Sequence, residues 1–419
     1  MENLKNKTYG LLRWSEQYTK TDMVYLAKGG FWITFAQIFV SLSSFILAIA
    51  FAHFVSKEDY GEYKYIISLI GIMSTFTLSG LNSAVLRSVS AGFDKTLQYA
   101  FWKNIKWSAV FFLLAFSSSI YYFVNSNYSI GISMLIAGSL WPFFMSTNLY
   151  NPYLIAKKDF KRNAIYFEII GNLFPVTCLI IAMLFTNHPS WLISTYIISN
   201  TLIGLVLYKI TTQVHKPSGG VDKTALNYSK HLSFINILSG IASNIDQVLV
   251  FHYIGATQLA IYNFAIAIPN QTKGPLKGLS NLMFPKFVER DEKEIHKNIY
   301  HKYMIMFLIG LTLAILYIIL APYIFGIFFP QYSESILYSQ IFAISFIAIT
   351  FNPADTYLTA KKKIREQYIN ATVNSIIQIV TIFIAILYWG LIGLIIARVI
   401  TRLISNFISF LLYEYSTRN

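Results

Sequence analysis

The feature that most restricts the fold of this chain is the recurrence of long apolar runs from one end to the other. A helical run of about 18 or more apolar residues can cross a hydrocarbon core about 30 Å thick. The composition agrees, since 55% of the 419 residues are hydrophobic, only 12% are charged and the mean hydropathy is +0.52. We therefore expect an all-α, polytopic membrane protein.

Twelve apolar runs bounded by polar or charged breaks are expected to be membrane-spanning helices. Lys and Arg cluster in alternate breaks, whereas the breaks NSNYS, TNHPS and QYSES contain neither. This alternation predicts that both termini are cytoplasmic. It also accounts for the net charge of +14, so that no nucleic-acid partner is expected. The expected spans are 30–52, 62–85, 106–124, 129–150, 164–186, 190–211, 230–251, 259–285, 302–325, 334–354, 367–388 and 390–413.

The chain contains a repeat of about half its length. The segment HFVSKEDYGEYKY at 53–65 aligns without a gap with HYIGATQLAIYNF at 252–264. A second pair, YLIAKKDFKR from Tyr153 and YLTAKKKIRE from Tyr357, supports the duplication. The offsets are 199 residues (252 − 53) and 204 residues (357 − 153). A unit of this size is too long for a solenoid and suits a duplicated transporter bundle.

The break after the sixth run has the composition of a linker, because Pro217, Ser218, Gly219 and Gly220 gather there. The predicted organisation has two pseudo-symmetric six-helix bundles. Its parts are a cytoplasmic, candidate interfacial segment at 1–29, a bundle at 30–211, a cytoplasmic linker at 212–229 and a bundle at 230–419.

Polar residues inside the eighth span lie on one helical face. They recur at spacings of 7, 3, 4 and 4 residues, and include two lysines near the middle of the bilayer. A face of this kind indicates a pathway, although the lysines could instead snorkel toward the cytoplasm. The residues are Asn263, Asn270, Lys273, Lys277 and Asn281.

Charged residues in three other spans are further candidates. Arg398 and Arg402 lie one turn apart in the last span, where a guanidinium is expected to contact a substrate or to pair across helices. Asp246 is interpreted as the counter-ion of a lysine such as Lys273, the carrier of a coupling proton, or a ligand for sodium. Lys64 and Arg87 lie near the ends of the second span. The neighbouring Lys57, Glu58 and Asp59 could form an outer gate, but they are interpreted as a solvated outer turn.

Uncharged polar residues in the other spans suit either a water-lined wall or the close packing of small residues. Those considered are Gln37, Ser41 and Ser44 in the first span, Ser79 and Asn82 in the second, and Asn236, Ser239, Ser243, Asn244 and Gln247 in the seventh.

No pattern in the chain predicts catalysis. The single cysteine, Cys178, excludes an intramolecular disulfide and a cysteine-based zinc site. No loop is long enough to fold as a domain, and there is neither a paired-aspartate metal motif nor a Gly-rich phosphate cradle. We therefore expect no catalytic residue, metal site or resident cofactor, and the candidate coupling ions are H+ and Na+.

Several motifs together resemble a known family. They are FVSKEDYGEYKY after the first span, LSGLNSAVLR at the end of the second, NIDQVLVFHYIGATQLAIYNFA across the seventh and eighth, and LMFPKF ending the eighth. The chain resembles the polysaccharide-biosynthesis flippases, the Wzx-type translocases of O-antigen and capsule repeat units. These belong to the multidrug/oligosaccharidyl-lipid/polysaccharide exporter superfamily, with the multidrug and toxin extruders and the lipid II flippases.

The resemblance implies two bundles facing each other in a V, with spans 1, 2, 7 and 8 around a central cavity. It places Lys64, Arg87, Asp246, Lys273 and Lys277 on or near the cavity wall. Alternating access would move a polyprenyl-pyrophosphate-linked oligosaccharide from the inner to the outer leaflet of the bacterial cytoplasmic (inner) membrane. The product would serve O-antigen, lipopolysaccharide or other surface polysaccharide biosynthesis. Expected partners are that lipid-linked oligosaccharide, membrane lipid, and a polysaccharide polymerase with its chain-length machinery.

Two alternatives remain. A cation-coupled multidrug and toxin extruder of the same fold would place more acid in its cavity, whereas the charges inside these spans are mostly Lys and Arg. A membrane glycan polymerase would be an enzyme, but the chain has no long outer loop to support such a site.

Overall fold

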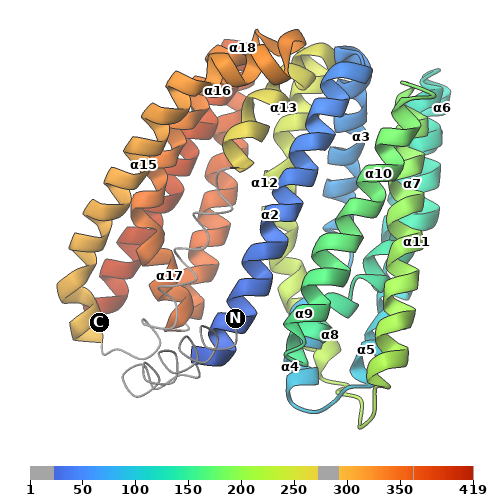
Figure 1. Cartoon of the computed structure of the whole chain (residues 1–419), viewed down its shortest axis with the longest axis vertical. Helices are drawn as coiled ribbons and strands as arrows, with labels where there is room; N and C mark the ends of the chain where they lie inside the picture. Colours follow the sequence, from blue (N-terminus) through green and yellow to red (C-terminus); the bar gives the residue numbers. More distant parts are fainter. Residues whose placement is uncertain (1–22, 272–291, 362, 419) are drawn as a thin grey trace, which may run out of the picture.

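The computed structural model describes residues 23–271, 292–361 and 363–418. Every regular element within these ranges is helical, and the helices form two bundles (Figure 1). The predicted all-α polytopic fold with two six-helix bundles is thereby confirmed. The described chain starts and ends at the same end of the molecule, which we call the termini end; the opposite one is the far end.

The helices of the first half run from residue 23 to residue 215. They are α2 (Met23–Phe54), α3 (Lys57–Ser74), α4 (Leu81–Ser90), α5 (Thr96–Trp107), α6 (Ala109–Val124), α7 (Tyr128–Thr147), α8 (Tyr150–Ala156), α9 (Phe160–Asn163), the π-helix η1 (Ala164–Ile170), α10 (Gly171–Met183) and α11 (Pro189–His215).

The helices of the second half begin at residue 225. They are α12 (Ala225–Tyr253), α13 (Ala256–Gln271), α15 (Glu292–Phe328), the 3-10 helix η2 (Pro330–Tyr332), α16 (Ser335–Ala343), the 3-10 helix η3 (Ile344–Phe351), α17 (Asn352–Ala360) and α18 (Ile364–Arg418).

Within the described ranges, nine helical stretches are long and apolar enough to cross a membrane. The longest of them, in α18, contains two arms, because Gly390 at φ 57° and ψ −142° reverses the chain between them. The second predicted span is present as α3 and α4, which are separated by a break at residues 75–80. The first part of the eighth is α13, and the rest of its expected range lies outside the described residues. These stretches together account for the twelve expected spans.

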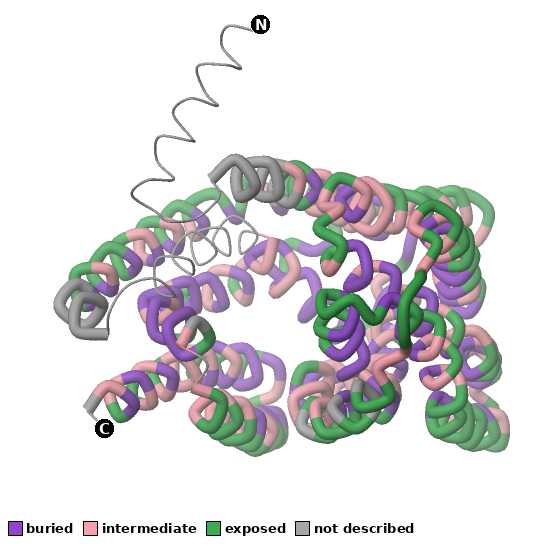
Figure 2. Tube along the Cα trace, turned by 90° about the horizontal axis from the view of Figure 1, so that it is seen from below, coloured by how far each residue is buried: buried purple, intermediate pink, exposed green. Residues whose placement is uncertain are grey.

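The outer surface of the bundles is apolar. Phe185, Val124 and Phe234 are 85%, 78% and 78% exposed. Seen from the termini end, exposed residues line the outer sides of the helices and buried ones gather toward the interior (Figure 2). Such a surface is stable only in contact with lipid.

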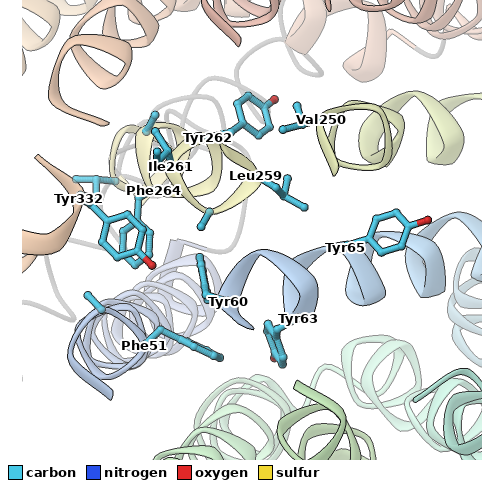
Figure 3. Packing of buried hydrophobic residues seen from close by; sticks show 14 of the residues in the cluster. Phe51, Tyr60, Tyr63, Tyr65, Val250, Leu259, Ile261, Tyr262, Phe264 and Tyr332 are labelled. Atoms are coloured by element: carbon cyan, nitrogen blue, oxygen red, sulfur yellow. The ribbon is translucent and has the colours of Figure 1, made fainter. Parts of the chain in front are cut away.

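The two copies of the repeated segment pack against each other at the far end. Tyr60 lies between Phe51 of its own half and Phe264 of the other, at ring-centroid distances of 4.8 and 5.1 Å, and Phe264 stacks on Tyr332 at 3.8 Å (Figure 3). Gly61 is also part of this contact, because a Cβ atom there would overlap the backbone carbonyl of Ala256. We call this contact the far-end seal.

The solvated turn expected at Lys57, Glu58 and Asp59 is instead the first turn of α3, in which Glu58 is exposed. Lys57 is the first residue of α3, and the Ser56 side chain caps the helix by accepting from the backbone N–H of Asp59. The Lys57 ammonium pairs with the Glu334 carboxylate of the second half at 2.9 Å. An ion pair between the halves therefore borders the far-end seal.

Candidate functional site

A polar cavity of about 510 Å3 lies between the two halves. Asn270 is 14 residues from the start of α13, so the cavity is about 21 Å from the far end along that helix. Among its described lining residues, the charged ones are both arginines. We call it the cationic cavity. Its lining is Gln37 and Ser41 of α2, Ser243 and Gln247 of α12, Ile266, Asn270 and Gln271 of α13, Phe342 of α16, and Arg398 and Arg402 of α18.

One of the two arginines is neutralised by a buried ion pair. Arg398 donates from Nε to Oδ2 of Asp246 at 2.9 Å, and its Nη2 pairs with the same oxygen. Tyr262 donates its hydroxyl to that oxygen as well. Asp246 is fully buried, so the pair ties α12, α13 and α18 together by satisfying a charge that would otherwise be very unfavourable there. The other oxygen, Oδ1, is buried without a hydrogen-bond partner in the described structure.

Arg402, one turn further along α18, has only neutral partners in the described part of the chain. It donates from Nη1 to the Ser345 hydroxyl at 3.0 Å and from Nη2 to the Asn270 side-chain oxygen at 2.9 Å. Its guanidinium lies 4.2 Å from the centre of the Phe342 ring. These contacts orient the group, and they leave its positive charge without a counter-ion.

A break in the tenth span supplies two of the residues that orient Arg402. Phe342 is near the end of α16, and Ser345 is in η3, where the helix tightens into 3-10 geometry. Irregular backbone at membrane depth is tolerated where it is buried in protein or lines a cavity. The break therefore accounts for the position of the Ser345 hydroxyl beside the guanidinium.

The structure brings together four of the residues selected from the sequence: Asp246, Asn270, Arg398 and Arg402. It does not bring Lys64 or Arg87 to this cavity. Lys64 is half-buried on α3 with its ammonium 5.5 Å from the Tyr60 ring centre, and Arg87 is exposed in the last turn of α4. Lys273, Lys277 and Asn281 lie outside the described residues.

Sequence reasoning missed Phe342 and Ser345. A phenylalanine in an apolar run looks the same whether it faces lipid or a guanidinium, and a single serine carries no periodic signal. In the described part of the chain, no three His, Cys, Asp or Glu side chains gather in a way that could hold a metal ion.

Comparison with known proteins identifies the family. Residues 50–302, which are 253 of the 419, match the family described as Polysaccharide biosynthesis protein. The chain belongs to this family. No curated protein matches this polysaccharide biosynthesis protein by sequence.

Solved structures show that this family member has a transporter fold. A MATE transporter crystallised in complex with MaD5 aligns with a TM-score of 0.65 and 13% identity, over 93% of this chain and 96% of that one. An outward-facing multidrug resistance MATE transporter of the MOP superfamily aligns at 0.63 and 14%, with the same coverage. A MOP superfamily transporter from Pyrococcus furiosus aligns at 0.59 and 13%, again over 93% and 96%. Family and fold together support a multi-pass membrane transporter.

Proposed function

We propose that the protein is a flippase that moves a polyprenyl-pyrophosphate-linked oligosaccharide from the inner to the outer leaflet of the bacterial cytoplasmic membrane by alternating access. The polysaccharide biosynthesis family and the MATE-like fold support a transporter for this pathway. The observation that carries the substrate assignment is Arg402, an oriented guanidinium in a cavity between the halves that has no counter-ion among the residues the structure describes.

The chemistry of Arg402 fits a phosphate group. A guanidinium has five N–H donors in a planar fork, and the two hydrogen bonds to Ser345 and Asn270 leave the other donors for a ligand. Charge-assisted hydrogen bonds to phosphate oxygens are among the strong ones in proteins. A half-buried cation whose described partners are all neutral is unfavourable within the membrane, and an anionic headgroup would relieve that cost.

Alternating access follows from the arrangement of the two ends. With both termini in the cytoplasm, the far-end seal and the Lys57–Glu334 pair close the outer side of the cavity. Opening toward the outer leaflet would separate these contacts while the termini end closes. The proposed product enters O-antigen, lipopolysaccharide or another surface polysaccharide, with a polymerase and chain-length machinery as partners.

Asp246 is the proposed coupling group. In the described conformation Arg398 and Tyr262 contact one carboxylate oxygen, and the other has no partner. A conformation in which Arg398 moved away would leave an unpaired carboxylate in the membrane, which would take up H+ or Na+.

The Pyrococcus furiosus relative is described as having a binding pocket of reverse polarity that suggests a different function. A cavity lined by arginines likewise departs from what an extruder of cationic drugs needs. The same fold therefore suits an anionic substrate here better than a cationic drug.

Reconstitution in lipid vesicles tests this function. Polyprenyl-linked glycan extracted from the cells that make this protein would be placed in one leaflet, and its appearance in the other would be measured. We expect Arg402→Gln to slow translocation by about 10- to 100-fold, because charge-assisted hydrogen bonds contribute about 1.5–3 kcal/mol each.

The matched control is Arg365→Gln, an exposed arginine at the other end of the same helix, which we expect to be neutral. Unchanged translocation by Arg402→Gln would contradict the role of the cavity. Conversion of the probe into a longer glycan would indicate a polymerase.

A further inference from the structure

A second cavity, of about 340 Å3, lies within the first half. Its wall is formed by α4, α5, the α7–α8 junction and η1, and none of its described lining residues is charged. Four side-chain amides distinguish it from an ordinary apolar gap. They belong to Asn82, Asn104, Asn148 and Asn151, and we call this cavity the asparagine pocket.

The side-chain oxygens of two of these amides accept no hydrogen bond in the described structure. Asn104 is 2% exposed and its Oδ1 accepts no hydrogen bond. The Oδ1 of Asn151 is buried and unpartnered in the same way. A buried carbonyl oxygen without a donor is unfavourable, so its persistence needs an explanation. Both residues belong to the wall of the asparagine pocket.

Two interrupted helices border the pocket. Leu78 and Ser79 lie in the break between α3 and α4, and Asn148 and Leu149 lie in the break between α7 and α8. In membrane transporters, interrupted helices mark binding sites because the freed backbone groups need a cavity or a ligand. The repeat strengthens this point. The 204-residue offset pairs Asn148 with Asn352 (148 + 204), which directly follows η3, the break that helps to form the cationic cavity.

The two cavities are close enough for one elongated molecule to reach both. Asn236 of α12 donates to the Ser79 hydroxyl on the rim of the asparagine pocket at 3.3 Å. Ser243, which lines the cationic cavity, follows on the same helix after seven residues, or about two turns. Asn236 and Ser243 are therefore on one face of α12, about 10 Å apart along the helix.

We propose that the asparagine pocket binds neutral sugar hydroxyls of the lipid-linked glycan while Arg402 binds its phosphate, an inference that rests on the proposed function. An amide both donates and accepts hydrogen bonds, as a hydroxyl does, so clustered amides match a hydroxyl-rich ligand. The absence of charge from the described lining gives the pocket no means of holding an anion or a cation. Phe167 adds an apolar surface on which the C–H face of a sugar ring can pack.

Binding measurements with the purified full-length protein in nanodiscs test whether the sugar and the phosphate bind at these two separate places. The first probe is polyprenyl-linked glycan extracted from the native cells, and the second is synthetic polyprenyl pyrophosphate, which has no sugar. We expect Asn82→Ala and Asn104→Leu each to weaken binding of the first probe by about 3- to 10-fold, the effect of losing one or two neutral hydrogen bonds. Binding of the second probe should not change.

Asn82 is exposed, so Asn82→Ala leaves the test intact even if the buried Asn104→Leu fails to fold. Asn125→Ala, at the exposed end of α6, is the matched control and should alter neither probe. Equal loss for both probes, or no loss for either, would overturn the sugar pocket. Arg402→Gln should weaken both probes; if it weakens neither while Asn82→Ala still discriminates between them, the phosphate assignment fails and the sugar pocket stands.

Discussion

The fourth and tenth spans, which the repeat pairs, both depart from regular α-helix near Asn148 and Asn352, and the chemistry around the two positions differs. In the first half, the break in the fourth span borders a pocket of neutral amides. In the second half, the break in the tenth span holds Ser345 against Arg402 in a cavity whose described charges are both arginines. The duplication thus kept a break at corresponding positions, while the side chains around the two breaks diverged into the two proposed kinds of site.

The largest expected effect concerns Asp246, a buried charged residue whose counterpart in the first half is apolar. The 199-residue offset pairs Asp246 with Leu47 (246 − 199), so Asp246→Leu makes the second half like the first. The substitution leaves Arg398 buried without its carboxylate, and we expect it to lower the free energy of unfolding by about 3–5 kcal/mol. Thermal unfolding of the purified protein would measure the loss.

The double variant Asp246→Leu/Arg398→Leu should recover most of that stability, because it removes both charges. Glu58→Leu, an exposed acid, is the control and should have little effect. If the double variant were as unstable as Asp246→Leu, an unpaired Arg398 would not be the cause.

The second effect concerns the place where the two halves touch. Gly61→Val puts side-chain atoms against the backbone of Ala256, and overpacking of this kind destabilises a contact by about 1–3 kcal/mol. We expect the far-end seal to open in part of the population. The distance between spin labels at Glu58→Cys and Ser333→Cys, in a Cys178→Ala background, would lengthen.

Gly326→Val provides the comparison, since no atom lies within 4 Å of a Cβ built at that glycine. A label distance that stays the same in Gly61→Val would mean that the seal is not held by this close approach.

A smaller effect distinguishes charge from geometry in the cationic cavity. Arg402→Lys keeps the positive charge but loses the planar fork that reaches Ser345 and Asn270 together. The loss of about one hydrogen bond should slow glycan translocation by about 5- to 10-fold, less than Arg402→Gln. Equal translocation rates for Arg402→Lys and Arg402→Gln would show that the planar guanidinium is required and that positive charge alone contributes nothing.

The smallest effect is expected from the partly exposed ion pair between Lys57 and Glu334 at the far end. Lys57 and Glu334 are 25% and 59% exposed, and pairs of this kind contribute about 0–1 kcal/mol. Lys57→Ala should shift the label distance slightly at low ionic strength and not at high salt, where the pair is screened. A shift that persists in high salt would point to the contact between the Lys57 ammonium and the Tyr332 ring, 5.8 Å from the ring centre.

Much of the fold was predictable because the length of an apolar run can be compared directly with the thickness of the bilayer. The spans, the duplication and the all-α bundles followed from runs of apolar residues and two aligned segments. Arg398, Arg402, Asp246 and Asn270 were identifiable because polar groups are rare and unfavourable in such runs. Lys57 was placed in a turn because it lies between the expected spans 30–52 and 62–85, whereas a capped helix already begins at this residue.

The sequence by itself determined where the chain crosses the membrane, that it is doubled and which residues had to find a polar partner. Only the tertiary structure decided those partners: Asp246 with Arg398, Arg402 with Ser345 and Asn270, and one copy of the repeated segment with the other. Hydropathy depends only on the order of residues along the chain. Which side chains of different helices meet depends on the rotation of each helix about its axis and on where its backbone is interrupted. Those features arise when the helices pack against each other.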